Sequence, residues 1–201
     1  FHKPIIIASN SGEDTIYKTE SDNDSNIEYT YGDYTCNEEI ENYETFEELN
    51  LSEDTLKGIY AYGFEKPSKI QQKAIIPMLK DRDIIAQSHS GTGKTGTFVI
   101  GSLELINKTI DHPQTIIISP TRELAKQTES VCKNLAKFHK NINIHLAIGG
   151  NLSNSNNRKY AHMNKTNNNN NINSKIIVGT PGRICDMIMR KILNMSYIKN
   201  L

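Results

Sequence analysis

Residues 83–108 read DIIAQSHSGTGKTGTFVIGSLELINK, and this stretch decides the fold. Its first five residues are mostly apolar, which predicts a short buried strand at 83–87. The next six residues contain two glycines, and the residues from Lys94 to Lys108 have the apolar content of a helix packed on a core. A strand, a glycine-rich turn and a helix in direct succession are typical of a phosphate-binding unit.

The turn contains the residue types that a phosphate group needs. Gly91 and Gly93 let the backbone turn tightly, so that its N–H groups point inward at phosphate oxygens. The helix beginning near Lys94 adds its positive end, Lys94 supplies a mobile charge for the β- and γ-phosphates, and the Thr95 hydroxyl can ligate Mg²⁺. Ser88 stands where the common pattern has glycine or alanine, a mild departure because serine is small. The alternative is a flexible turn before a helix, but the flanking strand and helix favour nucleotide binding.

His89 lies inside the same turn and is a candidate general base. A base has to face the attacking water, whereas this position lies on the outer rim of such loops. We therefore interpret His89 as a bystander in catalysis.

Outward from this unit, short apolar strands alternate with helices. Strands are predicted at 115–119, 142–150 and 175–180, and helices at 52–63, 68–79, 121–138 and 181–192. This alternation predicts an α/β domain with a doubly wound parallel sheet covered on both faces.

Two of the predicted helices have further signals. Ser52 is a candidate N-cap, and Gly63 stands where that helix should stop. In the helix at 121–138, Leu124, Val131, Leu135 and Phe138 are spaced to face a core.

The zero net charge of the 201 residues conceals a segregation of charge. Residues 1–54 contain 15 acidic and 2 basic side chains, whereas residues 55–201 contain 8 acidic and 21 basic ones. Such asymmetry is consistent with a basic module that binds a polyanion, and equally with a solubilising tail beside a lysine-rich surface.

Two segments lack the composition of a packed domain. Residues 1–43 are acidic and polar without an apolar period, so we predict an arm without fixed structure. Residues 151–174 are rich in asparagine and are predicted to be a disordered insertion. The ordered domain is expected at 44–201, on both sides of that insertion.

Other classes of protein find little support. No apolar run approaches the roughly 20 residues of a membrane span, and PIIIAS at 4–9 is far too short. The three cysteines are too far apart for a metal knuckle and odd in number, and the six histidines lack metal-ligand spacing. We expect a soluble intracellular protein, in the cytoplasm or the nucleus. Because the chain begins with Phe1, we expect it to be a fragment of a longer protein.

The remaining motifs support an identification. GFEKPSKIQ at 63–71, with Phe46 seventeen residues before Gly63, resembles the adenine-reading Q motif of DEAD-box RNA helicases. SGTGKT at 90–95 matches that family's phosphate loop, and its next three motifs follow in the family's order as PTRELA at 120–125, the glycine pair 149–150 and TPGR at 180–183. Each motif alone is weak, but their ordered occurrence is specific. The resemblance extends over residues 43–201 apart from the insertion, and it implies a RecA-like P-loop domain.

Within that family, the residues of these motifs are most similar to those of the translation initiation factor four-A group. LKGIYAYGFEKPSKIQQKAI at 56–75 carries this likeness. Ser88 and PGRICDMIMR at 181–190 lean toward the nuclear, exon-junction-type branch, whereas the insertion after Gly150 departs from both branches.

The resemblance implies an ATP site. Gln71 would read the edge of adenine and so select ATP over GTP, because a glutamine side chain offers both a donor and an acceptor, and Phe46 would stack on the base. The alternative for Gln71 is an exposed polar residue at a helix start. Lys94 and Thr95 would be catalytic, with Thr95 binding Mg²⁺ together with ATP. The implied ATP-binding residues are Phe46, Gly63, Phe64, Pro67, Ser68, Gln71, Ser88, His89, Ser90, Gly91, Thr92, Gly93, Lys94, Thr95 and Gly96.

The resemblance also implies that single-stranded RNA is held by its sugar–phosphate backbone. Threonine hydroxyls, arginine charges and helix N-termini would contact the phosphates without reading the sequence. The implied RNA-binding residues are Pro120, Thr121, Arg122, Gly149, Gly150, Thr180, Pro181, Gly182 and Arg183. The alternative is that both threonine motifs are ordinary helix caps. Glu123 is expected to pair with a nearby arginine.

The expected function is ATP-dependent RNA unwinding, in translation initiation or mRNA processing. Hydrolysis needs carboxylates to hold Mg²⁺ and to orient water, and the family takes them from an Asp-Glu-Ala-Asp motif that this chain does not contain. We therefore expect the chain to bind ATP without hydrolysing it.

Two other functions stay open. An ATP-dependent RNA clamp or core subunit of a messenger ribonucleoprotein would use the same residues with little unwinding. An unrelated P-loop enzyme, such as a nucleotide kinase, would leave the Q-like, PTRELA and TPGR segments unexplained. The expected partners are RNA and the proteins of an initiation-factor or exon-junction-type complex, on a chain that is monomeric.

Overall fold

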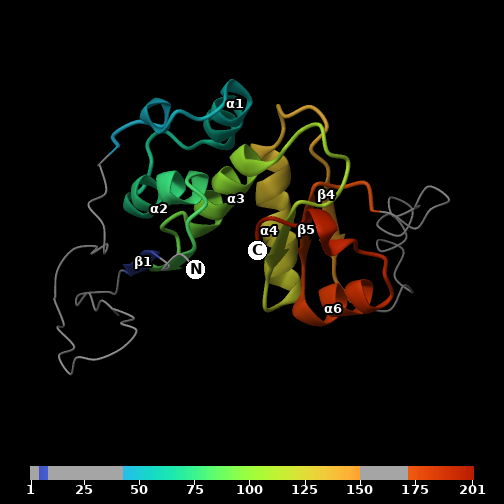
Figure 1. Ribbon diagram of the computed structural model, residues 1–201. Coiled ribbons are helices and arrows are strands. Elements are labelled where there is room, and N and C mark those ends of the chain that lie inside the picture. The colour runs from blue at the N-terminus through green and yellow to red at the C-terminus, as the bar shows by residue number, and fades with distance from the viewer. Residues whose placement is uncertain (1–4, 9–42, 150–171) are drawn as a thin grey trace, which may run out of the picture. The chain divides into compact units, whose positions relative to one another are not determined.

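The computed structural model describes residues 5–8, 43–149 and 172–201 (Figure 1). The chain divides into two compact units, the first up to Leu105 and the second from Ile106. Most of the acidic arm and of the asparagine-rich insertion lies outside the described residues, so their predicted disorder stays a prediction. No helix in these described ranges is long and apolar enough to span a membrane, and they contain no cluster of side chains that would hold a metal ion.

The first unit is built from helices packed beside a short parallel strand pair (Figure 1). Its elements are β1 (Ile5–Ala8), the 3₁₀ helix η1 (Glu47–Leu49), α1 (Glu53–Tyr62), α2 (Lys69–Leu79), β2 (Ile84–Gln87) and α3 (Lys94–Leu105). Helices α2 and α3 pack together through fully buried side chains that include Ile75 and Ile100.

The predicted ends of α1 are confirmed. Ser52 is its N-cap, and the Ser52 side chain accepts a hydrogen bond from the Thr55 N–H. Gly63 ends the helix with φ 96°, a left-handed conformation that favours glycine.

Strand β1 was not predicted from the sequence. It pairs in parallel with β2, Ile5 opposite Ile84 and Ala8 opposite Gln87. Four apolar residues at the start of a polar segment give too short a pattern to indicate a strand without its partner.

The prediction of a buried strand at 83–87 was wrong about burial. Ile84 is half-buried, and Ile85 has 56% of its surface exposed. Within the described residues β2 pairs with β1 alone. It therefore has the apolar sequence of an interior strand but lacks a second neighbouring strand that would help to bury it.

The second unit contains a three-stranded parallel sheet in the order β3-β5-β4. Its elements are β3 (Thr115–Ile118), α4 (Arg122–Leu135), β4 (Ile144–Ala147), β5 (Ile176–Gly179), α6 (Pro181–Met189) and the 3₁₀ helix η2 (Met195–Tyr197). The strands end in register, because Ile118 and Ala147 both lie opposite Gly179. The carboxyl ends of all three strands therefore meet at one edge of the sheet.

Helices cover this sheet as the alternation predicted. Ile177 of β5 belongs to a buried cluster with Ile184 and Met187 of α6. Because side chains alternate along a strand, Ile176 and Val178 point to the opposite face, and α4 packs along β4 and β5 (Figure 1). The predicted parallel α/β sheet with flanking helices is confirmed.

The predicted core face of α4 is partly wrong. Leu135 is fully buried and Val131 is half-buried, but Leu124 and Phe138 are 44% and 39% exposed. The buried positions are instead Ala125, Thr128, Glu129, Cys132 and Leu135, which share one face at helical spacing. This face includes small and polar side chains, which hydrophobicity alone did not reveal.

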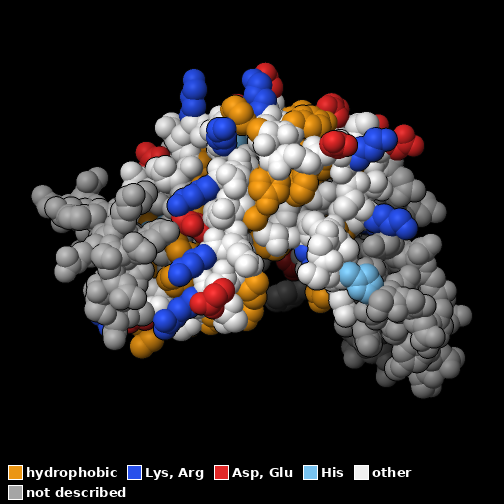
Figure 2. Space-filling model, turned by 180° about the vertical axis from the view of Figure 1, so that it is seen from behind, with side chains coloured by type: hydrophobic (Ala, Val, Ile, Leu, Met, Phe, Trp, Pro, Cys, Tyr) orange, Lys and Arg blue, Asp and Glu red, His pale blue; other side chains and the backbone are white. Residues whose placement is uncertain are grey.

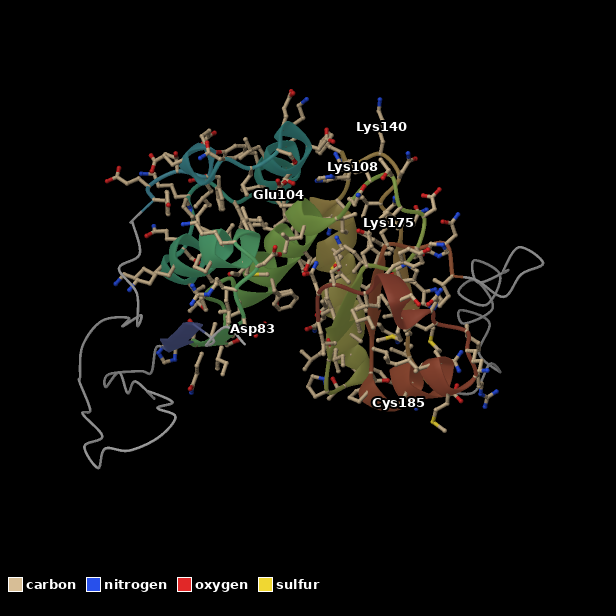
Figure 3. The ribbon with its side chains drawn as sticks, viewed as in Figure 1. Asp83, Glu104, Lys108, Lys140, Lys175 and Cys185 are labelled. Atoms are coloured by element: carbon tan, nitrogen blue, oxygen red, sulfur yellow. The ribbon has the colours of Figure 1, made fainter. Side chains whose placement is uncertain are left out.

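A buried lysine lies at the edge of the sheet where the strands begin. Lys175 is 3% exposed, and its Nζ donates to the carbonyl oxygens of Lys108 (2.7 Å) and Ile110 (2.9 Å), with the Asp111 carboxylate 3.3 Å away (Figure 3). These bonds satisfy the ammonium group inside the protein, so Lys175 is a structural residue.

Candidate functional site

The glycine turn has the backbone geometry that a phosphate loop requires. It leaves the carboxyl end of β2 and enters α3 at Lys94. Gly91 has φ 82° and Gly93 has φ 92°, values that side chains other than glycine adopt only with strain. The predicted strand–turn–helix unit is therefore present, with the N–H groups of the first turn of α3 facing the loop.

The side chains of the loop bond to the loop itself. Lys94 Nζ donates to the carbonyl oxygens of both Ser88 and His89. Ser88 Oγ donates to Thr92 Oγ1 (2.6 Å), which donates to the His89 carbonyl oxygen (2.9 Å). The ammonium group is thus held at the turn, while the side chain of His89 is exposed.

Gln71 lies directly against this loop. It is 2% exposed, its Oε1 accepts the Ser68 N–H (2.8 Å), and its Nε2 donates to the Gly93 carbonyl oxygen (3.4 Å). A Cβ atom added at Gly93 would lie 2.9 Å from Gln71 Nε2. The interpretation of Gln71 as an exposed polar residue is wrong, because contact with the loop buries it.

Phe64 makes a second contact between the same two segments. A Cβ atom added at Gly96, in the first turn of α3, would lie 2.8 Å from Phe64 Cε2. Gly93 and Gly96 therefore each admit a side chain of the 63–71 segment. The structure brings this part of the predicted ATP site together from positions more than twenty residues apart.

Phe46 belongs to an aromatic cluster. Its ring centroid lies 6.4 Å from that of Phe64, with an angle of 21° between the ring planes, and 6.3 Å from that of Tyr60. Phe46 is 0% exposed, so stacking on a base would require the cluster to open, and this role stays a prediction. A hydrogen bond of 2.6 Å to Glu47 raises the pKa of Tyr60 to about 12.

The predicted RNA-binding residues gather at the edge of the sheet where the strands end. Residues 120–122 follow β3, Gly149 follows β4, and residues 180–183 follow β5. Because β5 lies between β3 and β4, the three segments are neighbours. Gly150 lies outside the described residues.

The two threonines differ in their hydrogen bonding. Thr121 is the N-cap of α4, and its Oγ1 accepts the Leu124 N–H (3.2 Å). Thr180 is the N-cap of α6, but its side chain makes no capping bond, and Pro181 occupies the first turn. Capping thus explains the Thr121 side chain, whereas it leaves the Thr180 hydroxyl without a structural role.

The two arginines of the predicted RNA site are placed differently. Arg122 is exposed, and its Nη2 would lie 3.9 Å from a Cβ atom added at Gly149. Arg183 Nη1 lies 2.6 Å from Asp186 Oδ2, and Arg190 Nε lies 2.5 Å from the other oxygen of the same carboxylate. Glu123, which was expected to pair with an arginine, is exposed and makes no such ion pair within the described ranges.

On one face of the described part of the chain, basic side chains are mixed with acidic ones. On the face drawn in Figure 2, Lys and Arg side chains stand apart from one another, with Asp and Glu side chains among them. The case for RNA at this edge therefore depends on the geometry of the strand ends.

A family model described as DEAD/DEAH box helicase matches residues 68–201. The chain belongs to the DEAD/DEAH box helicase family. It is 47% identical over 157 residues to Eukaryotic initiation factor 4A of Drosophila melanogaster, an alignment that covers 78% of this chain and 36% of that relative. It is 43% identical over 167 residues to the ATP-dependent RNA helicase fal1 of Schizosaccharomyces pombe, covering 83% of this chain and 40% of that relative.

A solved structure supports the same family. The structure is similar to S. cerevisiae Dbp5 L327V bound to RNA and ADP BeF3, with a TM-score of 0.67, 40% sequence identity, and coverage of 78% of this chain and 37% of that one. The resemblance to DEAD-box helicases of the initiation factor four-A type is thereby confirmed. The chain spans a little over a third of the length of these relatives.

Two residues beside the DEAD/DEAH box motifs were missed by sequence reasoning. Gly179 packs so closely on β4 that a Cβ atom there would lie 2.3 Å from the Ala147 carbonyl oxygen. His145 of β4 is half-buried, and burial together with the positive charge of Arg183 lowers its pKa to about 4. A glycine directly before TPGR was a weak signal for the close packing at Gly179. A single histidine gave no signal for the burial of His145.

His145 should make the second unit less stable in acid. Its pKa lies below the ordinary 6.5, so the unfolded chain takes up a proton that the folded chain refuses until about pH 4. Stability should therefore fall between pH 6.5 and 4, by at most about 1.4 kcal/mol per pKa unit of difference. Urea unfolding of wild type and His145→Gln measures this, and the variant should lose part of the slope. Equal slopes below pH 6.5 would contradict the assignment, whereas parallel behaviour above pH 7.5 is the control.

Proposed function

We propose that this chain forms the ATP-binding part, and one portion of the RNA-binding surface, of an ATP-dependent RNA helicase. The whole protein would couple ATP binding and hydrolysis to RNA binding and local duplex unwinding, in translation initiation or mRNA processing. The observation that carries the proposal is the buried contact of Gln71 with Gly93, which joins a base-reading side chain to a phosphate loop.

The residues around that contact fit a nucleoside triphosphate. The loop between β2 and α3 offers backbone N–H groups and the positive end of α3 to phosphates. Lys94 can exchange its two carbonyl partners for phosphate oxygens, which are stronger acceptors because they carry charge. Gln71 would offer a donor and an acceptor to the adenine edge, and Thr95 would bind Mg²⁺ brought by the nucleotide.

The edge formed by the ends of β3, β4 and β5 would bind the RNA backbone. Two helices begin there, and Arg122 and Arg183 are at least partly exposed. Contacts of this type position a strand without reading its sequence. This proposal extends to Gly149, which follows β4 beside the segment that carries Arg183, and to Gly150.

Arg183 should contribute one ionic contact to RNA. Replacing it with alanine should weaken binding of single-stranded RNA regardless of sequence, and should reduce the slope of log K against log salt by about 0.7. Fluorescence titrations of a labelled oligonucleotide at several salt concentrations measure the slope. Arg190→Ala is the matched control, because Arg190 pairs with the same Asp186 but lies about two turns away, at the C-cap of α6. An equal loss of slope in both variants would instead indicate a general effect of charge.

The chain alone is proposed to bind ATP without turnover. Hydrolysis requires carboxylates that hold Mg²⁺ and orient water, and in the described residues Asp186 is engaged by two arginines within α6. The partners proposed for the whole protein are RNA and the proteins of an initiation-factor or exon-junction-type assembly, with this chain monomeric.

Unwinding by a preparation that also contains a second RecA-like domain tests this function. A short RNA duplex should be separated on addition of ATP and Mg²⁺, with ATP hydrolysis stimulated by RNA. Long-lived RNA complexes with an ATP analogue, but little strand separation, would favour an RNA clamp over a helicase. An absence of any RNA dependence would contradict both functions.

A further inference from the structure

Glu104 ties the end of α3 to the beginning of α1. Its Oε2 accepts the Ser52 N–H (3.1 Å), and its Oε1 accepts the Ser52 hydroxyl (2.6 Å). Oε1 also accepts the hydroxyl of Thr55, which is fully buried. Figure 3 shows Glu104 at the end of α3 that is next to α1. One half-buried carboxylate therefore holds three donors from a segment about fifty residues away.

These bonds add to the ordinary cap of α1. Ser52 Oγ accepts the Thr55 N–H at 3.4 Å and would cap the helix without help from α3. Glu104 accepts hydrogen bonds from the backbone N–H and the hydroxyl of Ser52, two donors that the capping bond does not use. Its negative charge at the N-terminus of α1 also complements the helix dipole.

A second contact attaches the other end of α1 to the other end of α3. Helix α1 ends at Gly63, and the next residue, Phe64, packs on Gly96 in the first turn of α3. At 1.5 Å per residue, the stretch from Gly96 to Glu104 rises about 12 Å and the ten residues of α1 about 15 Å. The two helices thus run side by side in opposite directions, fixed at both ends.

Helix α1 leads directly into the 63–71 segment, and α3 leads directly out of the phosphate loop. Any sliding of α1 along α3 would displace Phe64 from Gly96 and shift the start of the 63–71 segment, whereas Gln71 is held in addition by the packing of α2 on α3. Reading a base by hydrogen bonds tolerates little displacement, whereas contacts between a loop and phosphates do not depend on where the base lies.

We propose that Glu104 is a positioning residue for base selection, which fixes the distance between the base-reading segment and the phosphate loop. This inference rests on the proposed ATP site. Its consequence is that the hydrogen bonds of Glu104 to Ser52 and Thr55 contribute to the preference for ATP over GTP, although Glu104 lies at the far end of α3 from the nucleotide.

The test is a titration of the 201-residue chain with ATP and with GTP, each labelled on the ribose with a fluorophore, in the presence of Mg²⁺. Glu104→Gln keeps the shape but places an NH₂ group among three donors, and Glu104→Ala removes the acceptor. Each should lower the affinity for ATP by about 5- to 10-fold and that for GTP by less than about 2-fold. Glu53→Gln is the matched control, because Glu53 also lies at the start of α1 but is exposed and pairs with Lys57.

Thr55→Val provides a milder variant in case loss of the carboxylate prevents folding. It removes one donor and keeps the volume, so the ratio of the ATP and GTP affinities should fall by about 2- to 3-fold while hydrogen exchange in the second unit stays unchanged. Equal losses for ATP and GTP, or no change for either nucleotide, would overturn the positioning role. Wild-type protein that binds both nucleotides equally, or neither, would instead refute the proposed ATP site and the inference with it.

Discussion

Replacing Lys94 with alanine should abolish RNA-stimulated ATP hydrolysis in a preparation containing both helicase domains, and should weaken ATP binding by the present chain about 100-fold. The ammonium group is held at the turn by two carbonyl oxygens, directly where α3 begins. Alanine removes the side-chain charge and both bonds. The affinity can be measured by titration with fluorescent ATP, and the hydrolysis by phosphate release.

Lys80→Ala is the control for this variant. Lys80 is an exposed lysine just beyond the end of α2, so its loss changes the net charge equally without touching the loop. The control should retain both activities. Hydrolysis that survived in Lys94→Ala would show that the loop has been assigned the wrong function.

The second large effect is expected at Gly179. An alanine there would place its Cβ atom 2.3 Å from the Ala147 carbonyl oxygen, a backbone atom that can move only if β4 moves. Gly179→Ala should destabilise the second unit by about 3 kcal/mol, because overpacking a close backbone contact forces strands apart. Urea unfolding followed by circular dichroism measures this loss, and RNA binding should fall with it because Thr180 and Arg183 follow directly.

Gly182→Ala separates crowding from a general effect of losing a glycine. A Cβ atom at Gly182 would meet nothing within 4 Å, so this variant should unfold at the same urea concentration as the wild type or slightly higher. Comparable destabilisation of both variants would contradict the role given to the contact between β4 and β5.

The sequence allowed most elements of the fold to be predicted, because each depends on local patterns. The strand–turn–helix unit, the cap at Ser52 and the stop at Gly63 are all set by residues that are neighbours in the chain. Burial was predicted less well. Ile85 and Leu124 are hydrophobic but exposed, since burial depends on what packs against an element, and the buried face of α4 includes Ala125 and Thr128 instead.

The same distinction holds for the site. The functions of the loop glycines, of Lys94 and of the threonine motifs could be predicted, because each lies in a short contiguous motif. Glu104, His145 and Gly179 act through residues distant in sequence or on another strand, and their residue types alone carry no such information. Phe46 shows the reverse case, in which a residue implied by resemblance is enclosed by Phe64 and Tyr60.

The central claim, that nucleotide and RNA bind at two separate sets of strand ends, is tested most directly by hydrogen–deuterium exchange. ATP with Mg²⁺, added alone, should slow exchange in the loop at 88–93 and the first turn of α3, and in the 63–71 segment. Single-stranded RNA, added alone, should slow exchange at 119–123 and 180–184. Protection by ATP that left the glycine loop unchanged, or protection by RNA that avoided both of the helix starts after β3 and β5, would contradict this account.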